Sequence, residues 1–230
     1  MYALDYEKMI ENAFAGLATA PTCYLPKSFT NYNEAATVYT HDVDKAKKLI
    51  EEAGITPGAV ELCTTDNEQV VNMSTQVQQD LEALGFTVTL KERTTADTYA
   101  DIDGGAEFDM LLAPGDPSCF GADPDLLMNW WYGDNAWMKT RARWNESAEW
   151  KQLTELMASA LGQTGDEQQE TWNKCFDLIA EQAVLYPVLQ VKTATASWRD
   201  TANAEGVKID GFKGIGTTGM SFIDCATVTE

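Results

Sequence analysis

Three aspartates and three aromatic residues lie close together in the middle of the sequence. They are Asp116, Asp123, Asp125, Trp130, Trp131 and Tyr132. A carboxylate that follows a buried strand can pair with a cationic group of a ligand, while aromatic rings cover the apolar parts. Two carboxylates such as Asp116 and Asp123 are also the groups that a hydrolase uses as general acid and base. The structural alternative is that Asp116 begins a turn and the tryptophans are core residues.

Three other motifs lack the context that their chemistry needs. His41, the only histidine, stands beside Asp42, but no serine or cysteine lies in a recognised nucleophile motif. Residues 101–105 begin like a calcium loop, yet the twelfth position is Leu112 in place of glutamate. The glycines of residues 214–219 match a nucleotide-binding pattern, but too few residues follow for the required helix and strand. The sequence therefore predicts no catalytic residue, no metal and no cofactor.

Five cysteines are spread along the chain without a C-x-x-C pair. They are Cys23, Cys63, Cys119, Cys175 and Cys225. Zinc sites and thioredoxin-type redox sites need close pairs, so neither is expected. An odd number fits a mostly reduced protein, or one or two disulfides with a remaining thiol, and the sequence leaves both open.

The charge balance excludes some classes of partner. With 16 Lys and Arg against 36 Asp and Glu, the formal net charge of the 230 residues is −20, which repels nucleic acids and anionic lipids. Hydrophobic residues make up 44% of the chain, enough for a folded core. No apolar run reaches the roughly 20 residues of a membrane-spanning helix. The first residues lack a signal-peptide pattern, so we expect a cytosolic protein or a fragment of a longer chain.

The first half of the sequence predicts alternating helices and strands. The hydrophobic spacing favours helices over residues 5–15, 42–53 and 69–84, and strands over residues 60–64 and 86–90. A strand, a helix and a strand within about thirty residues are typical of a βαβ unit, so the two strands should be parallel. After a polar link, the apolar run of residues 108–113 indicates a strand buried on both faces.

The second half predicts an irregular segment followed by helices. Residues 114–145 contain Pro, Gly and Trp without a clear period, which indicates irregular structure. Helices are expected over residues 147–161 and 167–185, and a strand over residues 188–191. The predicted fold is α/β, with a mixed sheet, a βαβ unit and helices packed on both faces.

Several segments together carry a family resemblance. They are residues 3–7, 16–26, 44–54, 78–88, 108–110, 116–125, 143–145 and 181–187. In this order they resemble the second half of the family 5 extracellular solute-binding proteins. Those proteins serve ABC importers of dipeptides and oligopeptides, and the resemblance extends over nearly the whole chain.

The resemblance implies a periplasmic-binding-protein-like lobe of a bacterial transport protein whose two lobes close around a ligand. Residues 1–186 would form the second, ligand-binding lobe, and residues 187–230 would be the crossover segment that returns to the first lobe. The implied protein is a monomer and not an enzyme. It would lie outside the cytoplasm, as a periplasmic protein or a membrane-anchored lipoprotein, and its partners would be a small peptide and an ABC permease.

The resemblance also implies a ligand site. Peptide binders of the family carry an aspartate after a short strand that pairs with the α-ammonium group of the peptide, and Asp116 matches that position by order and surroundings. The expected ligand-binding residues are Asp116, Ser118, Cys119, Phe120, Trp130, Trp131 and Tyr132. The chain departs from the family at Ala113, where an aromatic residue is common, and in the longer spacing from Asp116 to Asp123. Relatives bind nickel complexes, haem, sugars or opines, so a non-peptide ligand is the alternative, and a carboxylate-based hydrolase is a more distant one.

Overall fold

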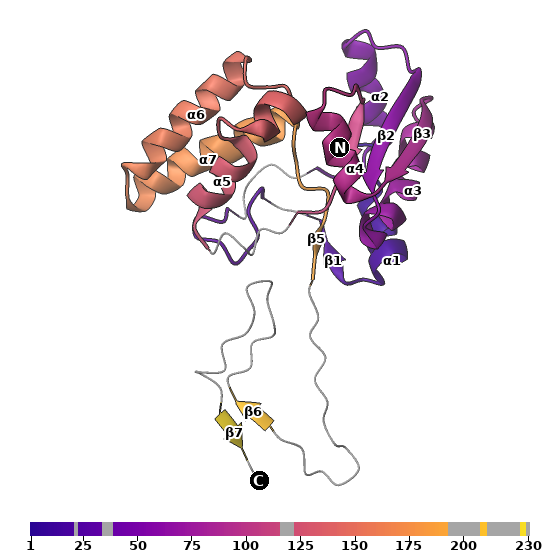
Figure 1. The fold of residues 1–230 in the computed structure, drawn as a ribbon. Helices are drawn as coiled ribbons and strands as arrows, with labels where there is room; N and C mark the ends of the chain where they lie inside the picture. Colours follow the sequence, from indigo (N-terminus) through magenta and orange to yellow (C-terminus); the bar gives the residue numbers. More distant parts are fainter. Residues whose placement is uncertain (21–22, 34–38, 116–121, 193–207, 211–225, 229–230) are drawn as a thin grey trace.

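A three-stranded sheet forms the centre of one half of the fold (Figure 1). The computed structural model describes residues 1–20, 23–33, 39–115, 122–192, 208–210 and 226–228. Strand β2 (Ala59–Thr65) lies between β3 (Thr87–Arg93) and β4 (Met110–Leu112), and both neighbours run parallel to it. The predicted parallel pairing is therefore confirmed. As described, this sheet is parallel and not mixed, and β4 is a short, half-buried strand that is not covered completely on both faces.

Helix α3 (Glu68–Glu82) covers one face of the sheet. Successive side chains of a strand point to opposite faces, so alternate residues meet this helix. Leu62 and Val88 of the strands are buried in one cluster with Met73 of the helix. Helix α1 (Tyr6–Phe14) packs against α3 in turn. The predicted βαβ unit thus has its helix where a crossover connection must run.

Helix α4 (Thr95–Asp103) covers the opposite face, in a segment that was predicted to be a polar link. Cys63 follows Leu62 in β2 and therefore points away from α3. It lines a small hollow together with Thr98 and Ile102 of α4. Helices lie on both faces of the sheet, as predicted, but the sequence analysis missed one of them.

Helices α1 and α2 (Val43–Glu52) begin at capping aspartates. Asp5 Oδ1 accepts a hydrogen bond of 3.0 Å from the backbone N of Lys8. Asp42 Oδ1 accepts one of 2.9 Å from the backbone N of Lys45. A carboxylate at this position satisfies an N–H that has no partner within the helix, and it also interacts favourably with the helix dipole.

The other half of the fold is helical (Figure 1). It consists of α5 (Pro124–Tyr132), the short π-helix η2 (Trp137–Arg141), α6 (Ala148–Leu161) and α7 (Gly165–Gln182). The two helices predicted after residue 146 are confirmed, and α7 ends early because Ala183 adopts a left-handed conformation at φ 47°. The prediction of irregular structure over residues 114–145 is wrong, because α5 and η2 lie within it. None of the helices in the described part of the chain is long and apolar enough to cross a membrane.

Each half has its own hydrophobic core. The core of the sheet half contains Leu4, Tyr6, Met9, Phe14, Ala18, Leu62, Met73, Val77 and Val88. The core of the helical half includes Leu25, Leu127, Met128, Tyr132, Met138, Leu153, Met157, Trp172, Phe176 and Ile179. Tyr24 and Phe29, between β1 and α2 in the sequence, also belong to this second core.

Two short strands join the halves (Figure 1). Strand β1 (Ala18–Thr19) follows α1, and β5 (Gln190–Val191) follows α7. They pair antiparallel, and the backbone N of Lys192 donates a hydrogen bond of 2.9 Å to the carbonyl oxygen of Leu17. A further antiparallel pair consists of β6 (Lys208–Asp210) and β7 (Ala226–Val228).

Candidate ligand-binding site

The predicted site begins where the chain leaves β4. This strand ends at Leu112, the described chain continues to Gly115, and it resumes at Ala122 just before α5. Four of the predicted ligand-binding residues lie outside the described residues, namely Asp116, Ser118, Cys119 and Phe120. In α/β sheets, ligands bind beyond the carboxyl ends of the strands, so the two described flanks frame the expected position.

Asp123 caps helix α5, just after the described chain resumes. Its Oδ1 accepts a hydrogen bond of 2.9 Å from the backbone N of Asp125, and Pro124 occupies the start of the helix, where its lack of an N–H is tolerated. The Asp125 carboxylate accepts a hydrogen bond of 2.5 Å from Nδ2 of Asn129. Burial and the neighbouring charge of Asp123 raise the pKa of Asp125. Both acids make hydrogen bonds within α5 and its N-cap, and these contacts stabilise the beginning of the helix.

Trp131 packs over Gly115, the last described residue after β4. A Cβ atom built at Gly115 would lie 3.1 Å from Cζ2 of the Trp131 ring, so the ring lies almost in contact with the backbone there. The centroid of the same ring lies 4.5 Å from that of Trp137. Trp131 is half-buried and therefore connects the helical half with the chain that enters the candidate site.

Trp130 lies on an exposed face of the same helix. Its side chain is 53% exposed, and Leu126, one turn earlier, is 56% exposed. Residues four positions apart lie on the same side of a helix, so the two side chains form an exposed apolar patch on α5. The role of Trp130 as part of a ligand-binding surface stays a prediction.

Tyr132 is a core residue. It is fully buried, and its hydroxyl donates a hydrogen bond to the carbonyl oxygen of Leu185. Its ring packs edge-on against Tyr24 at 5.3 Å, and burial raises its pKa well above the ordinary value. The prediction that Tyr132 forms a wall of the ligand pocket is corrected, because the packed core leaves no surface of this side chain for a ligand.

A cluster that the sequence analysis missed lies between α4 and η2. Arg141 donates two hydrogen bonds of 2.8 Å to Asp103, from Nε to Oδ1 and from Nη2 to Oδ2. Its guanidinium carbon lies 4.4 Å from the ring centroid of Tyr99 and 4.3 Å from that of Trp137. These hydrogen bonds and the charge of Arg141 lower the pKa of Asp103. We call these four residues the Arg141 clasp. One sequence signal for this cluster was available. Cations occupy the alternate positions 139, 141 and 143 of a very acidic chain.

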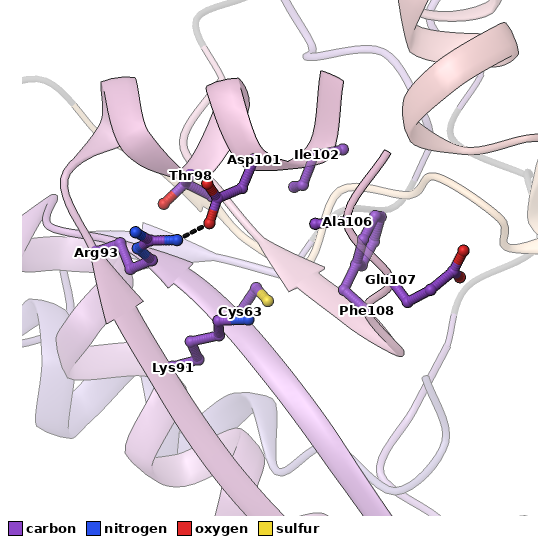
Figure 2. Close-up of a pocket in the computed structure, with 9 residues that line it drawn as sticks. All are labelled: Cys63, Lys91, Arg93, Thr98, Asp101, Ile102, Ala106, Glu107 and Phe108. Carbon is purple, nitrogen blue, oxygen red and sulfur yellow. Dashed lines mark ion pairs between the residues drawn. The ribbon is translucent and has the colours of Figure 1, made fainter. Parts of the chain in front are cut away.

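A small hollow lies between α4 and the sheet (Figure 2). Its lining consists of Cys63, Lys91, Arg93, Thr98, Asp101, Ile102, Ala106, Glu107 and Phe108. Figure 2 shows Arg93 and Asp101 paired across its rim. The space measures about 10 Å³, which is enough for one water molecule and too small for a peptide or a cofactor. This hollow is therefore not the ligand site.

The thiols of the described part of the chain are buried and reduced. Cys23, Cys63 and Cys175 are free, and burial raises the pKa of each, in the case of Cys175 to about 12. A thiol that stays protonated is a poor nucleophile and a poor metal ligand. Among the described residues, no three His, Cys, Asp or Glu side chains are grouped so that they could hold a metal ion. Cys119 and Cys225 lie outside the described residues.

Comparison with known proteins finds a matching family and several similar proteins. Residues 1–139 match the family of bacterial extracellular solute-binding proteins, family 5 Middle. The chain is 26% identical over 174 residues to the probable D,D-dipeptide-binding periplasmic protein DdpA of Escherichia coli K12, over 74% of this chain and 32% of DdpA. It is 24% identical over 230 residues to the glutathione-binding protein GsiB of Salmonella typhimurium LT2, over 97% of this chain and 43% of GsiB. The chain thus spans less than half the length of these relatives.

Solved structures share the fold. The ABC transporter substrate-binding protein CtaP of Listeria monocytogenes matches with a TM-score of 0.70 at 24% identity, over 83% of this chain and 38% of CtaP. The dipeptide-binding protein of Pseudoalteromonas sp. SM9913, in complex with Met-Leu, matches with a TM-score of 0.69 at 21% identity, over 83% and 38% of the two chains. These matches confirm a periplasmic-binding-protein-like α/β fold. Since the family match covers more than half of its residues, the chain belongs to the family 5 bacterial extracellular solute-binding proteins.

Proposed function

We propose that this chain is the ligand-binding second lobe of a solute-binding protein that captures short peptides for an ABC importer. The observation that carries the proposal is membership of family 5 together with the ligands of its relatives. DdpA is named for D,D-dipeptides and GsiB for glutathione, and the Pseudoalteromonas protein holds Met-Leu. All three ligands are short peptides that carry charged groups.

The surroundings of the candidate site suit such a ligand. In our proposal, Asp116 pairs with the α-ammonium group of the peptide. An ion-assisted hydrogen bond of this kind in a desolvated cleft contributes roughly 1.5–3 kcal/mol. The proposed wall of the side-chain pocket consists of Ser118, Cys119, Phe120, Trp130 and Trp131. The exposure of Trp130 and the contact of Trp131 with Gly115, immediately before Asp116, support this assignment.

The capture mechanism that we propose is closure of two lobes around the peptide. Residues 1–186 would form the second lobe, and residues 187–230 would return to the first, beginning near β5. The closed protein would then deliver its peptide to a permease in the bacterial membrane, working as a monomer outside the cytoplasm and without catalysing a reaction.

A non-peptide ligand is the second candidate. The chain is 26% identical over 201 residues to heme-binding protein A of Haemophilus influenzae. Structures with the same fold hold agropinic acid in AgaA of A. tumefaciens and Fe(III)-EDTA in NikA of Brucella suis. Ala113 would leave extra room beside the site, because family members often carry an aromatic residue at this position.

Calorimetry on the two-lobed protein tests the peptide proposal. The ligands to compare are a set of dipeptides and tripeptides and their N-acetylated forms, which lack the α-ammonium charge. We expect the free peptides to bind and acetylation to weaken binding by about ten- to a hundredfold, the worth of one charged hydrogen bond. Mass spectrometry of the native protein would identify any ligand retained from the cell. A retained haem, sugar or opine, with no heat from peptides, would reject the peptide and favour the second candidate.

The 230-residue chain on its own provides a further test. One lobe offers only part of the contacts of two closed lobes, so its Kd for the same peptides should be in the millimolar range or weaker. The binding free energy would then be no more favourable than about −4 kcal/mol. Micromolar binding by this chain alone would show that a first lobe is not needed.

A further inference from the structure

The Arg141 clasp connects the two halves of the fold. Tyr99 and Asp103 belong to α4 in the sheet half, whereas Trp137 and Arg141 belong to η2 in the helical half. The rings of Tyr99 and Trp137 meet edge-on, with centroids 5.7 Å apart. The guanidinium side chain that lies against both rings is only 18% exposed. Cation, carboxylate and rings therefore form one partly buried contact between the halves.

Only an arginine satisfies this geometry. The planar guanidinium donates two parallel hydrogen bonds to one carboxylate while its faces contact aromatic rings. A lysine in its place would keep the charge but would lose the second hydrogen bond and the flat stacking surface. Lower exposure also reduces the screening that weakens most surface ion pairs. The orientation of Trp137 is thus coupled to the position of Asp103.

The Arg141 clasp is connected through ring contacts to Gly115, where the chain enters the candidate site. Trp137 contacts Trp131, with ring centroids 4.5 Å apart. Trp131 in turn lies over Gly115, the last described residue after β4. A change in the tilt of Trp137 would therefore move Trp131 relative to the end of the strand.

We propose that Arg141 is a positioning residue for ligand binding. It holds Trp137 and Trp131 in the orientation in which Trp131 packs against Gly115, at the exit of β4. The positioning of the two rings stands on the described contacts, and its consequence for ligand affinity rests on the proposed function. Arg141 itself does not touch the ligand in this proposal.

A second ion pair between the same regions provides a matched control. Arg143 Nη1 lies 2.8 Å from Glu107 Oε2, and its Nη2 donates a hydrogen bond of 3.2 Å to the carbonyl oxygen of Ala106. Arg143 therefore also links the helical half to the segment after α4. Its carboxylate partner is 85% exposed, and the cation–ring contacts that the described residues make with Tyr99 and Trp137 come from Arg141. Arg143→Gln removes a bridging charge without disturbing the clasp.

The test is fluorine NMR of the protein labelled with fluorotryptophan. The signals of Trp131 and Trp137 are assigned with Trp131→Phe and Trp137→Phe. We expect Arg141→Gln and Arg141→Lys to shift or broaden both signals, Lys less than Gln, while Arg143→Gln leaves them at the wild-type positions. If the Arg141 variants unfold at a lower urea concentration but keep both signals in place, Arg141 is only a stabilising residue and the proposal is wrong.

Peptide affinity of the two-lobed protein supplies the second measurement. Arg141→Gln should weaken the binding of a dipeptide such as Met-Leu by about five- to tenfold, and Arg143→Gln by less than about twofold. Equal effects of the two variants would overturn the positioning role. If the wild-type protein binds no peptide, the proposed function fails, and the fluorine signals still decide whether Arg141 positions the two tryptophans.

Discussion

The hydroxyl of Tyr39 donates a hydrogen bond to the carbonyl oxygen of Ala180, near the end of α7. The last carbonyls of a helix have no partner within the helix, so a donor from elsewhere in the chain satisfies one of them. The rings of Tyr2 and Tyr186 lie edge-on against Tyr39, at 4.9 Å and 5.4 Å. The N-terminal segment of the sheet half is thereby connected to the last helix of the other half.

We predict that Tyr39→Phe lowers the free energy of unfolding by about 1–2 kcal/mol, because a buried carbonyl loses its hydrogen-bond donor. Urea denaturation of the chain measures the change. Tyr2→Phe is the control, since it retains the ring contact with Tyr39, and it should change stability by less than about 0.5 kcal/mol. Equal losses for the two variants would contradict the role assigned to the Tyr39 hydroxyl.

A side chain at Gly115 should collide with Trp131. A Cβ atom there would lie 3.1 Å from the ring, and valine adds two further methyl groups. We expect Gly115→Val to cost about 1–3 kcal/mol of stability through overpacking. Gly58→Val is the matched control, because the nearest atom to a Cβ at Gly58 is 4.0 Å away. The midpoint of thermal unfolding is measured for both variants and should be lower for Gly115→Val. Coinciding midpoints would mean that Trp131 moves aside without strain.

The elements that the sequence predicted have local signals. Asp42 caps α2, and Gly85, with φ of +96°, separates α3 from β3. The apolar spacing of Val70, Met73 and Val77 identified the buried face of α3. Each of these signals lies within the element or next to it, so the βαβ unit could be read directly from the sequence.

The missed helices depend on distant residues or on an ambiguous signal. Helix α4 carries Asp101 and Asp103 near its C-terminus, where acids are unfavourable for the helix dipole. Arg141, 38 positions away, pairs with Asp103 and compensates for it, which no local pattern shows. Helix α5 lies in a segment without a clear hydrophobic period, and it begins with Pro124, a residue that is well tolerated at a helix start. For the same reason the Arg141 clasp could not be predicted, since its members come from two elements that were missed.

The buried thiol of Cys175 makes stability depend on alkaline pH. Burial raises the pKa of this thiol from 9.0 to about 12, so folding favours its protonated form. The resulting stabilisation is fully present below pH 9 and is lost as the pH rises from 9 to 12, because only the unfolded chain ionises in that range. At its steepest this loss is about 1.4 kcal/mol per pH unit. Unfolding free energies should therefore fall more steeply for the wild type than for Cys175→Ala, and parallel pH profiles would contradict this prediction.

Substitutions of Asp116 and of Asp123, which caps α5, should have opposite effects on stability and on peptide binding. Asp123 caps α5, so Asp123→Ala should lower the unfolding free energy by about 1 kcal/mol and leave peptide affinity nearly unchanged. In our proposal Asp116 faces the peptide, so Asp116→Asn should keep stability and weaken peptide binding by about 1.5–3 kcal/mol, roughly ten- to a hundredfold. Calorimetry and urea denaturation of both variants of the two-lobed protein measure the two effects. Wild-type affinity in Asp116→Asn would mean that the ligand is not a peptide, or that the other lobe holds its amino end.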